Sequence, residues 1–279
     1  MSTFTDRTLV VSGGSRGIGL AIALAAARRG ANVVLLAKTA EPHPKLPGTV
    51  HTAVAEVEAA GGKGSGRGGG KAIAVVGDVR KEEDVQRAVD TAVERFGGID
   101  IVVNNASAIA TEPTDRLSAK KFDLMMDINI RGTFLLTKAA LPYLTKSPNA
   151  HVVTLAPPLN MNPHWLGAHP SYTLSKYGMT LLSLGWAAEY DSVGFACLWP
   201  ETYIATAAVS NLADGAELAS RSRDPQIMGD AAVEILSRPP ADVNGQCYVD
   251  SAVLAEAGVT DLSRYGGGDD PILDIFIDK

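Results

Sequence analysis

The chain of 279 residues has few cysteines, no excess of basic charge and no long apolar run. Two cysteines, Cys197 and Cys247, cannot build the disulfide framework of a small secreted domain. The net charge of −6 gives no support for a nucleic-acid partner, because basic side chains must neutralise phosphates in such complexes. No apolar run approaches the roughly 20 residues that span a bilayer, and residues 1–6 lack a signal-peptide pattern. These absences predict a cytoplasmic protein without a membrane span.

Metal ligands are equally scarce. The five histidines show no ligand spacing, and His164 and His169 are expected in loops. We therefore expect no metal site.

Short apolar segments alternate with helical segments along the chain. Strands are expected at 7–11, 31–37, 73–76, 99–103, 151–155, 193–198 and 246–249, with helices at 20–29, 49–60, 82–96, 122–144 and around residue 172. This alternation predicts an α/β fold with a doubly wound parallel sheet of the Rossmann type, as a single domain over 1–279. A glycine-rich insertion at 61–71 breaks the pattern. It lacks the glycine and the hydroxyl residue that a P-loop requires, so we expect a flexible connector.

A glycine turn follows the first expected strand. Gly13, Gly17 and Gly19 precede an alanine-rich helix, and Ser15, Arg16 and Ile18 lie between them. Strand, glycine turn and helix in this order suit a dinucleotide pyrophosphate, because the turn permits close backbone approach and the helix N-terminus faces the anion.

Tyr172 and Lys176 stand four residues apart in a segment without proline or glycine between them. In a helix this spacing places both side chains on one face. A nearby ammonium would lower the pKa of the phenol from about 10 and make it a usable general acid or base. Taken alone, the pair could also be a packed tyrosine above a surface lysine.

Together these motifs resemble the short-chain dehydrogenase/reductase family over nearly the whole chain. The resemblance rests on the glycine turn, Asp78, the segment 104–107, Asn129 and the Tyr172/Lys176 pair. The finer resemblance is to hydroxysteroid dehydrogenase-like proteins, in the segments 37–48, 157–160 and 198–200. Some such relatives carry a C-terminal lipid-binding domain, which we do not expect in a chain that ends at Lys279.

The resemblance implies an oxidoreductase in which Tyr172 exchanges a proton with a carbonyl or alcohol oxygen. Lys176 would lower the pKa of the tyrosine and hold the nicotinamide ribose. Asn129 would anchor a water that links Lys176 to solvent, or would satisfy a kink in its own helix. The cofactor contacts expected from the motifs and the resemblance are Gly13, Ser15, Arg16, Gly17, Ile18, Gly19, Lys38, Asp78, Val79, Asn105, Ala106, Ser107, Tyr172, Lys176, Pro200 and Ile204.

Charge predicts NADP(H) as the cofactor. An acid after the second strand would suit the ribose hydroxyls of NAD, but Lys38 stands there and Arg16 lies in the glycine turn. Both cations suit a 2′-phosphate, although either alone could be a solvated surface charge. By resemblance, Asp78 would hold the adenine, with a helix cap as its other role, and Asn105 would support the sheet end. Glu201 replaces the family's usual glycine after Pro200, which leaves the path of that loop open.

One position departs from the family pattern. Ala156 stands where the family places a serine that donates to the substrate oxygen. Loss of one such donor can cost about 10²–10³ in turnover. Thr154 or Asn160 could replace the serine.

The substrate is expected to be a small hydrophobic carbonyl or alcohol. Met161, Trp165, Leu166 and the segment 205–218 offer apolar surface for it, or for a lid or a subunit contact. By resemblance, the helices at 122–144 and 172–190 predict a homo-oligomer, a dimer or a tetramer. The sequence leaves a second function open, an NADP(H)-binding sensor or scaffold with little catalysis.

Overall fold

The computed structural model describes residues 4–43, 47–64, 70–210 and 215–278. Its centre is a seven-stranded sheet in the order β3-β2-β1-β4-β5-β6-β7, and every pairing is parallel. The strands are β1 (Thr8–Ser12), β2 (Asn32–Ala37), β3 (Ala72–Val76), β4 (Ile101–Asn104), β5 (Ala150–Thr154), β6 (Val193–Trp199) and β7 (Gln246–Val249). The predicted doubly wound parallel sheet is therefore confirmed, and each expected strand forms within two residues of its predicted ends.

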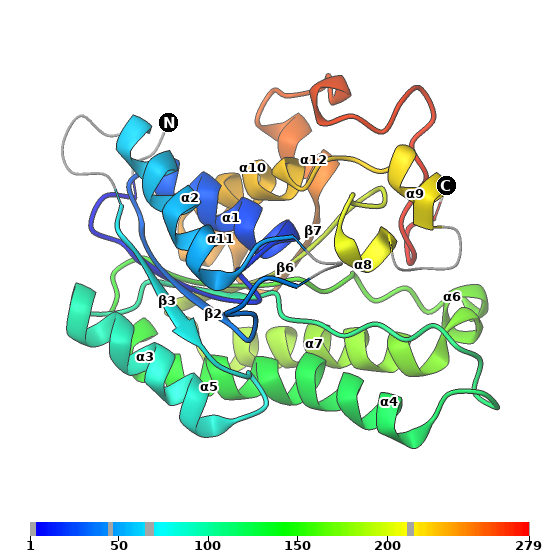
Figure 1. Ribbon diagram of the computed structural model, residues 1–279, viewed down its shortest axis with the longest axis horizontal. Coiled ribbons are helices and arrows are strands. Elements are labelled where there is room, and N and C mark those ends of the chain that lie inside the picture. The colour runs from blue at the N-terminus through cyan, green and yellow to red at the C-terminus, as the bar shows by residue number, and fades with distance from the viewer. Residues whose placement is uncertain (1–3, 44–46, 65–69, 211–214, 279) are drawn as a thin grey trace.

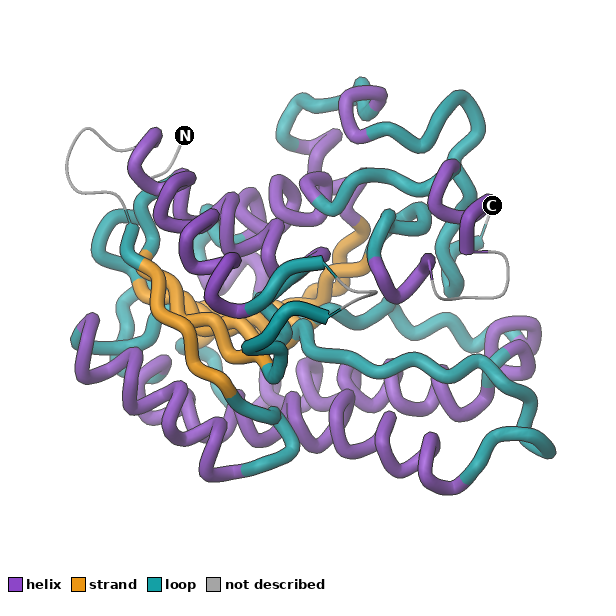
Figure 2. Tube along the Cα trace, viewed as in Figure 1, coloured by secondary structure: helices purple, strands orange, loops and turns teal. Residues whose placement is uncertain are grey.

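Helices cover both faces of the sheet (Figures 1 and 2). One layer contains α1 (Gly17–Arg28), α2 (Val50–Gly64), α10 (Gln226–Ile235), α11 (Pro240–Val243) and α12 (Asp250–Glu256). The other contains α3 (Glu82–Phe96), α4 (Ala119–Met125), the π-helix Met126–Arg131, α5 (Gly132–Leu144) and α7 (Pro170–Glu189). Shorter elements gather near one end of the molecule: α6 (Pro163–Ala168), α8 (Ala207–Ser210) and α9 (Gly215–Ser220), with a 3-10 turn at Ser263–Tyr265.

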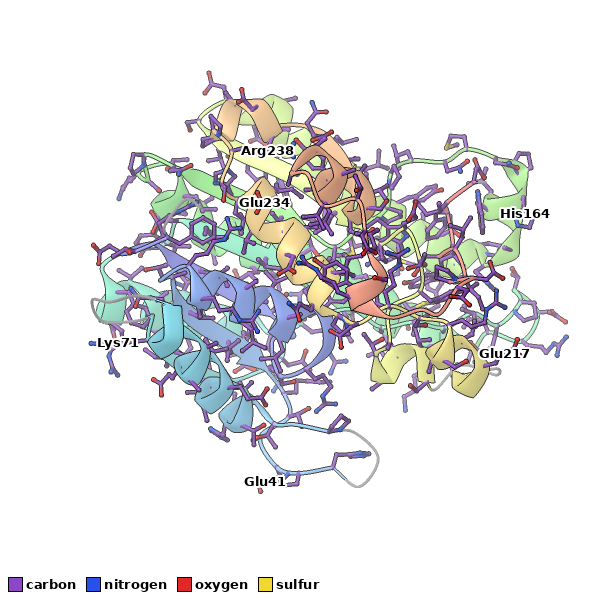
Figure 3. All side chains as sticks on the ribbon, turned by 90° about the horizontal axis from the view of Figure 1, so that it is seen from above. Glu41, Lys71, His164, Glu217, Glu234 and Arg238 are labelled. Carbon is purple, nitrogen blue, oxygen red and sulfur yellow. The ribbon has the colours of Figure 1, made fainter. Side chains whose placement is uncertain are left out.

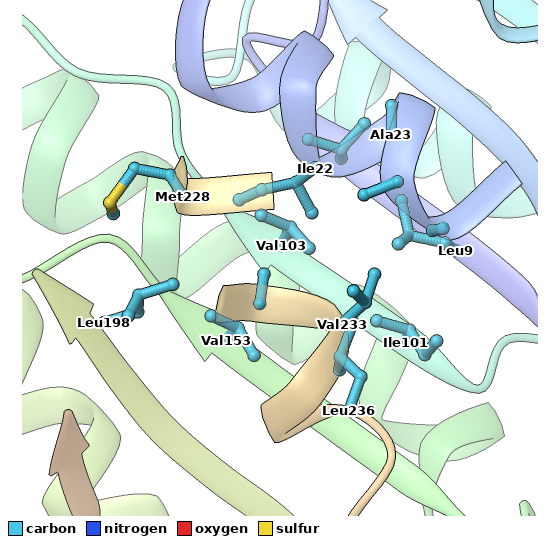
Figure 4. Packing of buried hydrophobic residues seen from close by; sticks show 14 of the residues in the cluster. Leu9, Ile22, Ala23, Ile101, Val103, Val153, Leu198, Met228, Val233 and Leu236 are labelled. Atoms are coloured by element: carbon cyan, nitrogen blue, oxygen red, sulfur yellow. The ribbon is translucent and has the colours of Figure 1, made fainter. Parts of the chain in front are cut away.

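The core lies on both sides of the sheet because its central strands are buried on both faces. Along β1, Leu9 and Val11 pack toward α1 and α10, whereas Val10 packs toward α3 and α5. Figure 4 shows the first of these layers, in which Ile22 of α1 and Met228 and Val233 of α10 belong to one cluster with Val103 and Val153 of the strands. Continuous apolar strands such as Leu9–Val11 follow from this double burial.

The long helix expected at 122–144 begins at Ala119 and contains one irregular stretch. Residues Met126–Arg131 adopt π-helical hydrogen bonding between α4 and α5. Asn129 lies within it and is fully buried. Such π segments often occur at functional sites, and this one directs the Asn129 amide away from its own helix, as described below.

The expected glycine-rich connector is shorter than predicted. Helix α2 continues to Gly64, so residues 61–64 are helical. Residues 65–69 lie outside the described part of the chain.

The sequence predicted no helix or strand in the C-terminal segment, and the structure has neither among its described residues. Residues 271–278 run back across the end of the sheet, and Leu273 forms an antiparallel bridge with Thr202. Across the described ranges, none of the helices has the length and apolar character needed to cross a membrane.

Candidate active site

A cavity of about 800 Å³ opens at the carboxyl ends of the strands. It lies beside β1 and β4, where the chain reverses its direction along the sheet, which is the usual place for ligands in such folds. Its walls bring together the glycine turn, Lys38, Asp78, the segment 105–107, Tyr172, Lys176 and the segment 199–206. The sequence motifs that were predicted to form one site therefore meet in one cavity.

The glycine turn lies directly against the end of β4. Gly13 and Gly17 have φ of +69° and +56°, which side chains other than glycine rarely adopt. Asn105 Nδ2 donates to Ser12 O at 2.9 Å and to Gly13 O at 3.1 Å. A Cβ at Gly19 would lie 2.5 Å from that same Nδ2. Asn105 thus fixes the turn, as predicted for its support of the sheet end, and Gly19 is required for packing and does not itself line the cavity.

The N-terminus of α1 faces this cavity without a side-chain cap. Its N-cap, Arg16, is extended and its side chain caps no backbone N–H, and the first turn holds no acidic residue. Arg16 donates to Gly48 O at 2.9 Å, while its buried Nε has no partner among the described residues. Free N–H groups, the positive end of a helix and a guanidinium suit an anionic pyrophosphate, so these residues fit a dinucleotide.

Lys38 lies at the end of β2 on the same wall. Its Nζ is 3.7 Å from Asp78 Oδ2, and the side chain is 57% exposed. Asp78 is held more firmly by Arg80, whose Nη2 lies 2.6 Å from Oδ2. The hydrogen bond from Arg80 lowers the pKa of Asp78 to about 2, with Lys38 adding to that effect. Arg16, Lys38 and Arg80 outnumber the single carboxylate of Asp78, so this region carries a net positive charge. Of these cations, Lys38 is the one described as mostly exposed to solvent.

The alternative role of Asp78 as a helix cap is wrong. The N-cap of α3 is Lys81, and Asp78 instead accepts from the backbone and side chain of Arg80. The carboxylate of Asp78 pairs with Lys38 and Arg80, which balance its negative charge.

Tyr172 and Lys176 lie one helical turn apart on α7, as predicted, and both are buried. Lys176 Nζ donates to Leu155 O and lies 5.0 Å from the centre of the Trp199 ring. Burial lowers the pKa of Lys176 to about 7. The expected fall in the pKa of Tyr172 is not found, because burial and then the nearby Asp274 raise it above its ordinary value. Tyr172 therefore keeps its proton at neutral pH.

Asn129 connects three segments around this pair. Its Oδ1 accepts from Ala108 N at 2.8 Å, and its Nδ2 donates to Ala108 O at 3.0 Å and to Ser175 Oγ at 2.9 Å. Ala108 lines the cavity and Ser175 lies beside Lys176 on α7. The amide thus holds the loop after β4 against α7 and does not satisfy a kink in its own helix.

None of the three residues considered for the serine role lines the cavity. Ala156 is fully buried against Met179 and Cys197. Thr154 Oγ1 accepts from Ser183 Oγ of α7 at 2.8 Å. Asn160 Nδ2 donates to Asp278 Oδ2 at 2.8 Å, in the loop that holds the C-terminal segment. Replacement of the serine by Thr154 or Asn160 therefore stays a prediction, and the lining of the cavity gives it no support.

Of the other residues predicted to contact the cofactor or the substrate, some line the cavity and some do not. Ser15, Ile18, Val79, Ala106, Ser107, Pro200 and Ile204 line the cavity, as do 205–209 and Leu218. Met161 is 67% exposed, and Trp165 and Leu166 pack against the C-terminal segment. Residues 211–214 of the expected apolar segment lie outside the described residues. No group of three or more potential metal ligands occurs in the described ranges.

Sequence reasoning missed the wall that the C-terminal segment forms. Asp274 and Ile275 line the cavity opposite the glycine turn, together with Trp199 and Tyr203. Asp274 interrupts the apolar run 272–277, and it is only 8% exposed. A carboxylate inside an apolar run was the available signal, because acidic side chains are seldom buried without a reason.

A family model described as short chain dehydrogenase matches residues 7–215. The chain belongs to the short-chain dehydrogenase family. It is 50% identical to hydroxysteroid dehydrogenase-like protein 2 of Xenopus tropicalis over 275 residues, and 46% identical to that of Homo sapiens over 259 residues. These matches cover 98% and 92% of this chain but only 64% and 60% of the relatives, so the chain spans about three fifths of their length.

Solved structures agree with this membership in an oxidoreductase family. A putative dehydrogenase from Xanthomonas campestris superposes with a TM-score of 0.89 at 47% identity, and covers all of both chains. A short chain dehydrogenase from Mycobacterium thermoresistibile gives 0.90 at 46% identity, covering 99% of this chain and 97% of its own. A more distant short chain dehydrogenase from Mycobacterium paratuberculosis, bound to NAD, shares the fold at 22% identity, with a TM-score of 0.75 over 89% of this chain and 97% of its own.

Proposed function

We propose that the protein is an NADP(H)-dependent oxidoreductase that interconverts a hydrophobic carbonyl compound and its secondary alcohol. A bound nicotinamide would supply or accept the hydride. Tyr172 would give its proton to the carbonyl oxygen in reduction and take it back in oxidation. Its buried, protonated phenol at the cavity wall is the observation that carries this role.

Lys176 and Asn129 would prepare that tyrosine. The Lys176 ammonium, when protonated, lies one turn from the phenol and would stabilise the phenolate left after proton transfer. Asn129 holds Ala108 and Ser175 in position around it. Asn129 acts through these neighbours, since it is not among the cavity-lining residues.

The preference for NADP(H) rests on Lys38 and Arg16. Both cations line the cavity where β2 ends, and the nearest acid, Asp78, is already held by Arg80. A 2′-phosphate would gain the half-exposed Lys38 ammonium, whereas a plain ribose would find no carboxylate there to accept its hydroxyls.

Fluorescence titration with NADPH and NADH tests this preference. We expect tighter binding of NADPH, and Lys38→Ala should weaken NADPH binding about tenfold while NADH binding changes little. A hydrogen bond between charged groups contributes roughly 1.5 kcal/mol or more, and about 1.4 kcal/mol corresponds to tenfold in affinity. Lys71→Ala is the matched control, since Lys71 lies just before β3, at the amino ends of the strands, and does not line the cavity (Figure 3). Equal affinity of the wild type for both cofactors would refute the NADP(H) assignment.

A second function is favoured by one observation, the absence of the family serine. With Ala156 buried in the core, the protein could bind NADP(H) as a sensor or scaffold and catalyse little. Reduction of a panel of aldehydes and ketones, followed by NADPH absorbance, separates the two functions. Turnover in the wild type above that of Tyr172→Phe supports the enzyme, and binding without such turnover supports the sensor.

The substrate class follows from the cavity walls near Tyr172. Ile109, Ile128, Leu155, Trp199 and Ile275 give this part an apolar lining, which suits a small hydrophobic substrate. We also propose a homo-oligomer, a dimer or a tetramer, formed through α4, α5 and α7, which carry exposed apolar side chains. Free thiols at Cys197 and Cys247 are consistent with a cytoplasmic location, which stays a prediction.

A further inference from the structure

The cavity holds an acidic side chain that the expected chemistry does not use. Asp274 comes from the C-terminal segment, more than 90 residues after Tyr172, yet both line the same cavity. Only 8% of Asp274 is exposed. A buried carboxyl group beside a tyrosine and a lysine on one cavity wall is a candidate for a direct role.

The backbone holds Asp274 in a defined position. Its N–H donates to Glu201 O at 2.9 Å, and Leu273 pairs with Thr202 in an antiparallel bridge. On the next residue, Ile275 O accepts from Trp199 Nε1 at 3.0 Å. The segment that replaces the family's usual path after Pro200 is therefore bound to the segment that carries Asp274.

We propose that Asp274, as a neutral acid, donates a hydrogen bond to the substrate oxygen beside Tyr172 and replaces the missing serine. The inference rests on the proposed oxidoreductase function. A neutral carboxyl group carries one O–H donor, as a serine does, whereas a carboxylate can only accept. Ala156, Thr154 and Asn160 do not line the cavity, whereas Asp274 does.

The surroundings of Asp274 keep its proton in place. Burial raises the pKa of Asp274 to about 8. The hydrogen bond from the backbone N–H of Ile275 opposes that rise, the carboxyl group of Asp250 adds to it, and Lys176 opposes it. Tyr172 and Tyr203 are the other titratable groups affected by it, and both have a raised pKa. Asp274 is accordingly neutral below about pH 8 and becomes an acceptor above it. An apolar site can keep a carboxylic acid neutral so that it acts as a donor.

Tyr203 is a competing donor on the segment that pairs with residues 272–274. It lines the same cavity, and burial raises its pKa to about 12, so its hydroxyl is also protonated. Its proton would remain across the whole range in which Asp274 titrates. The pH dependence of turnover therefore distinguishes the two residues.

The test compares Asp274→Asn, Asp274→Leu, Tyr203→Phe and Tyr172→Phe with the wild type in NADPH-dependent reduction of the best carbonyl substrate from pH 6 to 9.5. Leucine removes the donor and should lower kcat roughly 10²-fold. Asparagine keeps an N–H donor at every pH, so it should retain activity within about tenfold and lose the decline that the wild type shows above about pH 8. Because Asp274 raises the pKa of Lys176, Asp274→Asn should also move the Lys176 titration to lower pH, below the range in which Asp274 titrates. Tyr203→Phe should keep the wild-type profile.

Separate readouts identify each failure. NADPH binding and the melting temperature should be unchanged in Asp274→Asn, which shows that the cavity has formed. Wild-type kcat in Asp274→Leu, or an unaltered decline above pH 8 in Asp274→Asn, would overturn the role of Asp274 and leave the oxidoreductase function intact. Turnover of the wild type no higher than that of Tyr172→Phe would overturn that function, and this inference with it.

Discussion

Gly19 is a residue whose missing side chain determines the shape of the site. A Cβ there would lie 2.5 Å from Asn105 Nδ2 and 2.7 Å from Gly13 O, and the second of these is backbone that cannot rotate away. Gly19→Ala should therefore displace the glycine turn, weaken NADPH binding at least tenfold and lower the melting temperature.

Gly62→Ala is the matched control for that substitution. Gly62 lies in α2, and a Cβ there meets nothing within 4 Å among the described residues. Alanine should raise the unfolding free energy by up to about 1 kcal/mol through helix propensity, with no effect on binding. Equal effects of the two substitutions, measured by thermal melts and NADPH titration, would contradict the steric account.

A second single residue, His151, is expected to make the unfolding free energy depend on pH. The side chain is fully buried in β5, with Nδ1 3.1 Å from Arg7 Nη2 and Nε2 3.1 Å from Arg238 O. Burial, and then Arg7, lower its pKa to about 4. Between pH 4 and about 6.5 the unfolded chain binds the proton and the native protein does not.

The unfolding free energy should therefore fall by up to about 3 kcal/mol as pH drops from 6.5 to 4, and the contribution of His151 should be fully present above 6.5. Urea titrations of the wild type and of His151→Gln at several pH values measure this slope. A variant as acid-sensitive as the wild type would assign the slope to other groups.

At the scale of elements, the C-terminal segment depends on Phe276. Its ring lies 5.2 Å from the ring of Tyr177, 5.8 Å from that of Trp199 and 6.4 Å from that of Tyr172, measured between centres. Phe276 is 3% exposed. Removing a buried aromatic ring costs about 3–5 kcal/mol, so Phe276→Ala should release residues 272–278 locally.

Hydrogen exchange of the backbone amides in 272–278 measures that release. Exchange should accelerate in Phe276→Ala and stay slow in Met161→Ala, since Met161 is 67% exposed and its removal leaves no cavity. Unchanged protection in Phe276→Ala would mean that the hydrogen bonds of the segment hold it in place without the ring.

The sequence predicted those elements whose burial pattern is simple. Strands such as Leu9–Val11 are apolar on both faces, and Glu82–Phe96 has three acids in its first turn and Gly97 at its end, so their positions follow from local chemistry. The position of the π-helix does not follow from local chemistry, because the hydrogen bonds of the Asn129 side chain depend on Ala108 and Ser175 from other elements.

In the site, too, the sequence predicted the residues whose positions follow from local spacing. Gly13, Lys38 and Tyr172 lie at positions fixed by local spacing, and they meet because parallel strands end at one edge. The position of Asp274 in the cavity wall depends on how residues 201–203 pair with 272–274. No local pattern encodes such a long-range pairing.

At the scale of the whole molecule, one side carries unpaired apolar side chains. Leu124 on α4, Phe134 on α5, and Leu174 and Leu181 on α7 are 37% to 58% exposed, and these helices cover the same face of the sheet (Figure 1). Exposed apolar groups of this kind mark surfaces for association. We expect the homo-oligomer to form there.

Phe134→Lys with Leu181→Glu should shift the protein to smaller species in sedimentation velocity, since charges are depleted from the core of such interfaces. Leu159→Glu is the control, as Leu159 is 39% exposed but lies in the loop after β5. An oligomeric state identical in both variants would exclude this face.

Because residues from 272–278 form part of the cavity wall, the cavity can be completed only after the rest of the described fold has been synthesised. The glycine turn and Tyr172 are synthesised long before Asp274, so a chain still growing on the ribosome can assemble the sheet but not the wall opposite it. Chains cut before Leu273 should therefore keep the fold and bind cofactor while the oxygen of the substrate meets water instead of Asp274.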